Sequence, residues 1–182
     1  MTYTELYGGA ITIEKLPSTF IDVSHIRQVP DTQEVFINQT TEASGSFDQS
    51  LIIDLLEKVD PLGYEEAMQL HLLDIVPDHV HNQPLEVVES DSIDRYFSYV
   101  AFKPEYKKVE PGSPKQIITL LCLIRLDKVD TDVVIQYIIP LHEAGKIDFN
   151  GYSELDEKVK DAYSLFKEIG TSFTVQDWNL FG

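Results

Sequence analysis

Cysteine is almost absent from this sequence, and no hydrophobic run is long enough to cross a membrane. Cys122 is the single cysteine, so no intramolecular disulfide can form. The N-terminal MTYTELYGG has neither the basic nor the apolar part of a secretory signal. The longest apolar segments, QIITLLCLIRL and VVIQYIIPL, stop short of the ~18 residues of a membrane-spanning helix. We therefore expect a soluble intracellular protein without a membrane partner.

Basic residues are also scarce. The chain has 14 Lys and Arg against 31 Asp and Glu, which gives a formal charge of −17 and an isoelectric point near 4.5. This field repels phosphate backbones, so nucleic acid is not expected as a partner. With 182 residues and 43% hydrophobic side chains, the composition predicts a single globular domain over residues 1–182. A core of that size needs no metal or disulfide for stability.

Common catalytic motifs are missing as well. The sequence has no G-x-S-x-G, G-x-G-x-x-G, G-x-x-x-x-G-K-[ST] or H-E-x-x-H, so neither an enzyme nor a bound cofactor is supported. His79 and His81 have a spacing that could serve a metal, but a third ligand is lacking and a solvated loop is favoured. The acidic run Asp127, Asp130 and Asp132 lacks the glycine and glutamate of a calcium loop, which predicts a solvated hairpin turn.

Hydrophobic periodicity predicts the secondary structure. A hairpin or bulged edge strand is expected within residues 3–20, a strand around Val35 and Ile37, and helices over 51–59 and 64–75, the first capped by Asp48 or Ser50. Strands are expected over 84–90, 95–103, 116–126 and 131–141, then a helix over 153–169 and a last strand within 173–181.

Two of these strands, 116–126 and 131–141, are separated by only a short acidic connection. They should therefore pair antiparallel, and their continuous apolarity predicts central strands covered on both faces. Cys122 then becomes a buried, inert thiol, and His71 a packed helix residue. The proline-containing tract 103–115 is expected to be a surface loop. The fold class is α+β, a largely antiparallel sheet with helices on its faces.

One segment is more polar than a simple connection requires. In DVSHIRQVPDTQEV, polar residues surround Pro30, whose fixed φ restrains the backbone that presents them. The candidate binding residues among them are Asp22, Arg27, Asp31, Gln33 and Glu34. Ordered carboxylates on a rigid loop suit a basic partner surface, because less conformational entropy is lost on docking. An ordinary ordered loop is the alternative.

The same segment carries a family resemblance. LYGGAI at 6–11 followed by FIDVSHIRQVPDTQEVF at 20–36 resembles the Ran guanine-nucleotide release factors, the Mog-type nuclear import factors. Further similar segments follow in order: SLIIDLLEKVD at 50–60, EEAMQLHLLD at 65–74, LIRLDKVDTDVVI at 123–135 and DWNLFG at 177–182. Residues 77–116 are similar only loosely.

The resemblance implies a Mog/PsbP-like α/β/α sandwich with about six mostly antiparallel strands. It also implies a protein that binds the small GTPase Ran, promotes release of its guanine nucleotide and supports nuclear import. The family's Ran-binding acidic motif corresponds to Asp31 and Glu34 here. We infer that Asp22, Arg27 and Gln33 belong to the same site, with Arg27 orienting the carboxylates.

Two other functions stay open. A Ran-binding adaptor would dock without accelerating release, and a small-molecule binding or hydrolytic domain would use a pocket between sheet and helices. We expect a monomer found in both nucleus and cytoplasm, because a chain of 20.7 kDa is small enough for passive entry and carries no basic localisation run.

Overall fold

The computed structural model describes residues 2–39, 47–106, 110–147, 149 and 154–182. Its centre is a seven-stranded antiparallel sheet in the order β3-β4-β5-β9-β8-β7-β6. In chain order these strands are β3 (Phe20–Asp22), β4 (Gln33–Asn38), β5 (Gln49–Glu57), β6 (Gln83–Ser90), β7 (Ile93–Phe102), β8 (Gln116–Leu126) and β9 (Thr131–Leu141). A smaller sheet contains β1 (Tyr3–Leu6), β2 (Ile11–Glu14) and β10 (Thr174–Val175) in the order β1-β2-β10.

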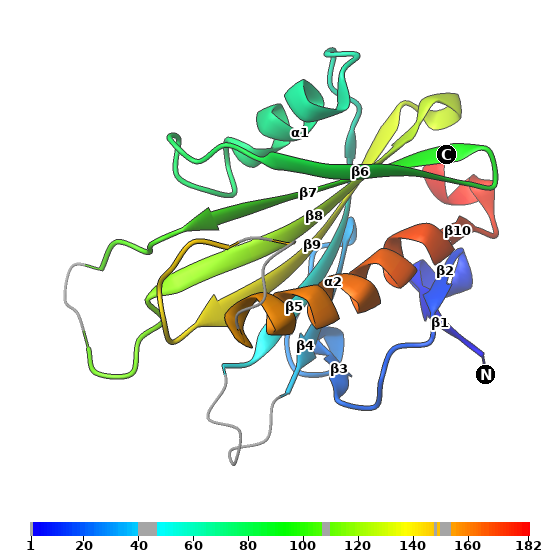
Figure 1. Ribbon diagram of the computed structural model, residues 1–182. Coiled ribbons are helices and arrows are strands. Elements are labelled where there is room, and N and C mark those ends of the chain that lie inside the picture. Colours follow the sequence, from blue (N-terminus) through cyan, green and yellow to red (C-terminus); the bar gives the residue numbers. More distant parts are fainter. Residues whose placement is uncertain (1, 40–46, 107–109, 148, 150–153) are drawn as a thin grey trace.

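Two helices cover opposite faces of the large sheet (Figure 1). Helix α1 (Tyr64–Leu72) buries Ala67, Met68 and Leu72 in one hydrophobic cluster. Helix α2 (Glu154–Ser172) packs on the other face together with the small sheet and contributes to a larger cluster. The predicted antiparallel sandwich with helices on its faces is confirmed, with seven strands in the main sheet rather than about six.

The β8–β9 hairpin confirms the expectation of central strands buried on both faces. The two strands pair antiparallel from Gln116↔Leu141 to Leu126↔Thr131. Along β8, Leu120 and Cys122 belong to the cluster under α2, whereas Leu121 and Leu123 belong to the cluster under α1. Such alternation produces a continuous apolar run because both faces are covered. Cys122 is buried, and its burial raises the pKa of the thiol, as expected for an inert cysteine.

The helix predicted over 51–59 is wrong, because this segment is strand β5, paired with β4 and β9. Leu51 and Ile53 face the cluster under α2, while Leu56 faces the cluster under α1. A strand with apolar residues on both faces also places them at three- and four-residue spacings, so its pattern imitates a helix. Pairing with two neighbouring strands decides the outcome.

The acidic hairpin turn contains a second correction. Asp127 and Asp130 are exposed as predicted, but Asp132 is buried within β9. Its Oδ1 accepts a hydrogen bond from Arg125 Nε at 3.0 Å, and its Oδ2 lies 2.8 Å from His71 Nε2. Asp132 also accepts a hydrogen bond from the backbone N–H of Val59 at 3.1 Å. This network ties α1 and its leading loop to the centre of the sheet.

The other predicted helices and strands agree with the structure where it describes the chain, although the last strand is limited to β10 and residues 178–181 form a 3-10 helix. The N-terminal hairpin is β1–β2, and the helices at 64–75 and 153–169 correspond to α1 and α2. Part of the 103–115 tract, residues 107–109, lies outside the described residues. Within the described part of the chain, no helix is long and apolar enough to cross a membrane.

Candidate functional site

The polar segment between β3 and β4 forms an ordered connection at one end of the sheet. At its start, Asp22 Oδ1 accepts hydrogen bonds from the backbone N–H of Ser24 at 2.9 Å and from its hydroxyl at 2.7 Å. At its end, the backbone N–H of Gln33 donates to the carbonyl of Pro30 at 2.9 Å and closes a turn. Asp31 lies exposed inside that turn. The backbone that presents Asp31 is therefore fixed on both sides.

Glu34 is held by a contact with the N-terminal hairpin. Its Oε1 accepts a hydrogen bond from the backbone N–H of Tyr7 at 2.6 Å. Tyr7 has a φ of 51° and precedes Gly8, whose φ is 67°, so this left-handed turn depends on glycine to direct the N–H toward the carboxylate. Burial raises the pKa of Glu34, the Tyr7 N–H opposes that rise, and the Asp22 carboxylate adds to it. The site thus holds a partly desolvated negative charge.

Tyr7 also joins the loop to the sheet. Its hydroxyl donates to the carbonyl of Thr32 at 2.8 Å and lies 3.1 Å from the carbonyl of Ile53. Burial raises the pKa of this hydroxyl, as do the nearby carboxylates of Glu34 and Asp54, so it remains a protonated donor. The LYGG segment and the PDTQE segment therefore form one structural unit.

Gln33 and Glu34 point to opposite faces of the sheet, as successive strand residues must. Gln33 pairs with Asp54 across the strands, and its Nε2 donates to Asp54 Oδ2 at 3.0 Å. Asp54 Oδ1 is buried and has no hydrogen-bond partner among the described residues. Burial raises the pKa of Asp54, although the Gln33 amide opposes the shift. Asp54 is therefore a second carboxylate with a raised pKa, on β5 next to Gln33.

We expect Asp54→Asn to stabilise the protein at neutral pH. A raised folded-state pKa means that folding disfavours the charged carboxylate, so stability falls as pH rises from the unfolded pKa, ~3.9, through the folded one. Asparagine keeps one oxygen for Gln33 and removes that penalty. Urea unfolding at pH 7 should give a higher midpoint for the variant, with the advantage lost near pH 3. A lower midpoint at pH 7 would contradict the account.

Arg27 does not orient the carboxylates. It is exposed, and among the described residues it forms no ion pair with Asp22, Asp31 or Glu34. Asp22 Oδ2 instead lies 3.8 Å from His25 Nε2. The Arg27 guanidinium thus remains on the surface of the loop, where it can contact a partner.

Three residues of the site could not be identified from the sequence pattern. Tyr7 is 27 residues away from Glu34, and Asp54 lies on a segment predicted as helix. Ile26, in the middle of the loop, has 72% of its surface exposed. In the sequence, Ile26 is distinguished only by its position directly after the turn that Asp22 caps. Ile26 adds an apolar contact point to an acidic loop.

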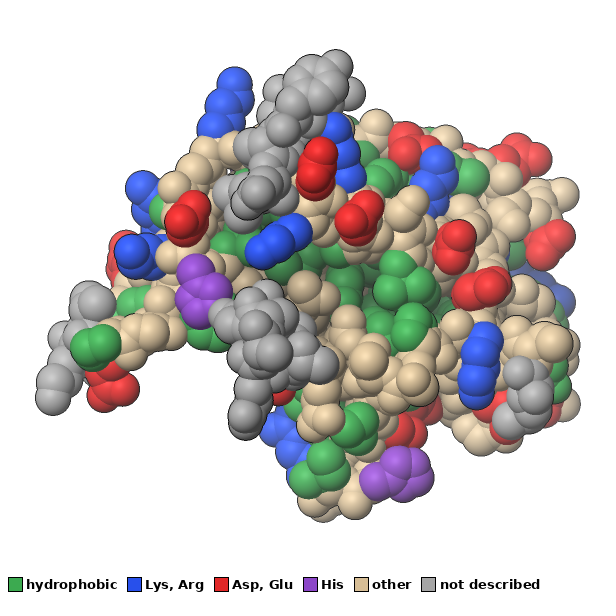
Figure 2. Space-filling view, turned by 60° about the horizontal axis from the view of Figure 1, so that its bottom comes forward, with side chains coloured by type: hydrophobic (Ala, Val, Ile, Leu, Met, Phe, Trp, Pro, Cys, Tyr) green, Lys and Arg blue, Asp and Glu red, His purple; other side chains and the backbone are tan. Residues whose placement is uncertain are grey.

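Acidic side chains are not confined to this loop. Figure 2 shows them spread over one face of the molecule, with hydrophobic side chains in a central recess. The loop is distinguished by the fixed geometry of its carboxylates rather than by the number of charges. Among the residues that the structure describes, no three His, Cys, Asp or Glu side chains are arranged to hold a metal.

The fold and the loop together define a small α/β/α sandwich domain that presents a rigid acidic surface, the form of a binding protein. Residues 4–140 match the family model described as Ran-interacting Mog1 protein. The chain is 34% identical to the nuclear import protein MOG1 of Saccharomyces cerevisiae, over 97% of this chain and 83% of that protein. It is 32% identical to the human Ran guanine nucleotide release factor, covering 97% and 95%.

Solved structures of Mog1 proteins are similar to this fold. The crystal structure of the Saccharomyces cerevisiae Ran-binding protein Mog1p superposes with a TM-score of 0.69 at 30% identity, covering 99% of this chain and 97% of that one. A Mog1 variant with a glutamate replaced by alanine gives a TM-score of 0.70, also at 30% identity, covering 99% and 98%. The chain belongs to the Ran-interacting Mog1 protein family.

Proposed function

We propose that this protein binds the small GTPase Ran and promotes release of its bound guanine nucleotide, in support of nuclear protein import. The observation that carries the proposal is the pair of carboxylates on the β3–β4 loop. Asp31 is exposed in a closed turn. Glu34, at the start of β4, accepts the Tyr7 N–H, and its burial raises its pKa. The names of the relatives, which include Ran guanine nucleotide release factors, support the same function.

A basic partner offsets the desolvation of Glu34. The partly desolvated Glu34 carboxylate gains most from a Lys or Arg side chain that approaches along the loop, because charge-assisted hydrogen bonds are stronger than neutral ones. Asp31 offers a second acceptor, and the exposed Ile26 offers an apolar contact on the same loop. Asp22 and Arg27 belong to the same proposed contact surface. Gln33 contributes to the site through the turn that its backbone N–H closes with Pro30, because its side chain faces Asp54.

Release of nucleotide follows from thermodynamic coupling rather than covalent chemistry. If this protein binds nucleotide-free Ran more tightly than loaded Ran, the nucleotide loses affinity for Ran by the same factor. A tenfold loss requires about 1.4 kcal/mol of differential binding. Asp31 and Glu34 can supply it by attracting basic groups of Ran that otherwise serve the nucleotide or its neighbouring loops. The protein acts as a regulator without cofactor, metal or active site of its own.

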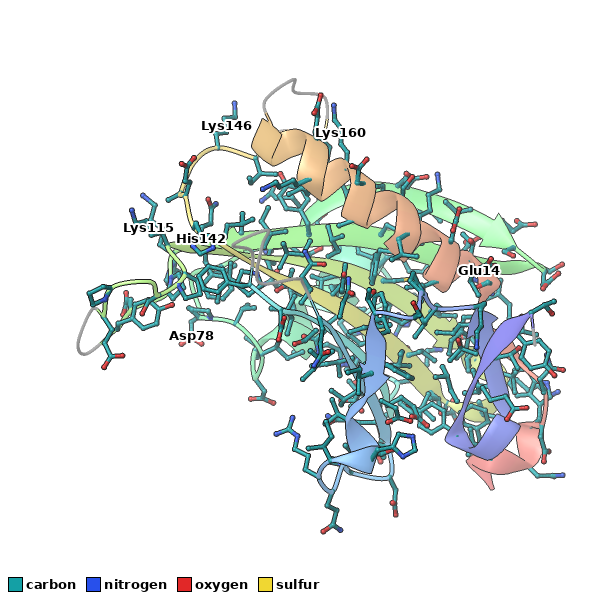
Figure 3. The ribbon with its side chains drawn as sticks, turned by 90° about the horizontal axis from the view of Figure 1, so that it is seen from below. Glu14, Asp78, Lys115, His142, Lys146 and Lys160 are labelled. Atoms are coloured by element: carbon teal, nitrogen blue, oxygen red, sulfur yellow. The ribbon has the colours of Figure 1, made fainter. Side chains whose placement is uncertain are left out.

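The proposed function also implies an oligomeric state, a location in the cell and a set of partners. We propose a monomer present in nucleus and cytoplasm, with Ran as partner and without nucleic acid or membrane as partners. Lys115 and Lys146 lie near His142 at one end of the molecule, away from the segment that joins β3 and β4 (Figure 3). These two lysines therefore do not cover the carboxylates of the loop.

We expect Ran affinity to fall as salt rises. Exposed charges are screened over about 8 Å at physiological ionic strength, and the formal charge of −17 adds long-range attraction to a basic face. Calorimetric titration of Ran from 50 to 300 mM NaCl should show a dissociation constant that increases steadily. A constant that does not change with salt would remove the electrostatic part of the proposal, and no binding at any salt would remove the proposal.

A Ran-binding adaptor is the second candidate, since the same loop could dock Ran without loosening its nucleotide. The two candidates predict equal binding but different nucleotide release. An adaptor leaves the release rate of loaded Ran unchanged, whereas a release factor raises it.

A further inference from the structure

Helix α1 carries apolar side chains on its outer face as well as on its inner face. Ala67, Met68 and Leu72 are buried against the sheet. Leu70 and Leu73, at the outer face and the C-terminal end of the helix, have 43% and 54% of their surface exposed. A surface helix normally turns charged or polar residues outward. These leucines therefore add nothing to the described core and remain available to a partner.

The two leucines lie in a groove of about 400 Å³. Its lining is mostly apolar and consists of Pro61, Glu65, Glu66, Gln69, Leu70, Leu73 and His81. None of these lining residues belongs to the segment that joins β3 and β4, so the groove uses different side chains from the proposed Ran site. Figure 1 shows α1 covering one face of the large sheet.

Gln69 fixes one wall of the groove. Its Oε1 accepts hydrogen bonds from the backbone N–H of Asn82 at 2.9 Å and from the Asn82 side chain at 2.9 Å, and lies 2.6 Å from His81 Nδ1. Its Nε2 donates to the carbonyl of Val80 at 2.9 Å. Asn82 is buried. The loop that follows α1 is thus held against the helix, and the groove exists before any partner arrives.

Carboxylates form the rim. Glu65 and Glu66 are exposed, and neither forms an ion pair within the described part of the chain. The Glu66 carboxylate folds back over Gly63, where a Cβ would meet Glu66 Oε2 at 2.0 Å. Gly63 therefore lets this charge lie at the N-terminus of the helix, where a negative charge is stabilised.

We propose that this groove binds a basic amphipathic segment of a second protein partner, one that inserts leucine-like side chains between Leu70 and Leu73 and places Lys or Arg against Glu65 and Glu66. Charge complementarity selects this occupant. A second copy of the chain would bring two acidic rims and two charges of −17 together, which disfavours a symmetric dimer through this face. Amphipathic helices commonly dock into apolar grooves in this way.

A synthetic helix tests the proposal. Fluorescein-labelled LKKLLKLLKKLLKL is titrated with the full-length protein and followed by fluorescence anisotropy, beside a twin peptide in which glutamate replaces lysine. We expect saturable binding of the basic peptide only. Leu70→Ser with Leu73→Ser should weaken binding at least tenfold, and Glu65→Gln with Glu66→Gln should weaken it and reduce its salt dependence.

The control pair is Val87→Ser with Leu180→Ser, because these residues are 50% and 37% exposed and lie outside the groove. This pair should bind the peptide like the native protein, and urea unfolding should show all variants folded, since exposed substitutions change stability little. Equal loss in the control pair, no binding by the native protein, or a native dimer that Leu70→Ser with Leu73→Ser dissociates would overturn the proposal.

Discussion

Asp132→Ala is expected to lower the free energy of unfolding by about 3–5 kcal/mol, the cost of breaking a buried ion pair from one side. The carboxylate is fully buried between Arg125 and His71, and it accepts the Val59 N–H as well. Alanine leaves the Arg125 guanidinium buried without its counter-ion. The other nitrogens of Arg125 donate to the carbonyls of Val59 and Pro61, so the loop before α1 loses its anchor too.

The effect should depend on pH. Burial alone would raise the pKa of Asp132, but the hydrogen bonds from His71 and Arg125 outweigh it and hold the pKa below its usual range. A depressed pKa contributes stability that is present above the unfolded value, ~3.9, and lost as pH falls through the folded one. The difference in free energy of unfolding between the native protein and Asp132→Ala should therefore become smaller as the pH falls.

Urea unfolding at pH 7 and at pH 3 measures both expectations. Asp127→Ala is the matched control from the same hairpin, because Asp127 is exposed and pairs with Lys58 at the surface. Exposed pairs contribute at most about 1 kcal/mol. Equal effects of the two substitutions would show that the buried network does not stabilise the fold.

Asp31→Asn combined with Glu34→Gln is expected to weaken Ran binding between tenfold and about a hundredfold. Each amide replaces a hydrogen bond to a charged group, about 1.5–3 kcal/mol, by a neutral one, about 0.5–1.5 kcal/mol. The pair therefore loses about 2–3 kcal/mol, and ~1.4 kcal/mol corresponds to a factor of ten. The amide variants are preferable to alanine. Glu34→Ala would leave the Tyr7 N–H without its acceptor and destabilise the loop, whereas glutamine keeps an oxygen for it.

Glu89→Gln with Asp91→Asn serves as the control for charge. This pair also removes two exposed negative charges, but it lies at β6, on the edge of the sheet opposite β3. Asp91 has a φ of 49°, which asparagine tolerates well. Calorimetry should give near-native Ran affinity for this pair. An equal loss of affinity in both pairs would mean that only the overall charge matters.

Most of the fold could be predicted from the sequence. The helical period of α2 reports a single covered face. The long apolar runs of β8 and β9 report strands covered on both faces, and their short connection predicts antiparallel pairing. Strand β5 could not be predicted, since its apolar residues face two cores and its pattern fits a helix equally well. Its identity depends on β4 and β9, which are its neighbours in space.

The candidate site divides in the same way. The loop and its acidic residues are visible in the sequence because Pro30 and its polar neighbours are contiguous. The hydrogen bond from Tyr7 to Glu34 and the burial of Asp132 are not visible in the sequence, because both depend on contacts between distant segments. Local chemistry could thus be predicted, and the contacts that fix it could not.

The release rate of nucleotide from Ran tests the central claim most directly. Ran carrying a fluorescent guanine nucleotide is mixed with excess unlabelled nucleotide and with the native protein, the Asp31→Asn, Glu34→Gln variant, or the Glu89→Gln, Asp91→Asn control. We predict faster nucleotide release with the native protein and the control, and little acceleration with the loop variant while it remains folded. No acceleration by the native protein, or full acceleration by the folded loop variant, would contradict this prediction.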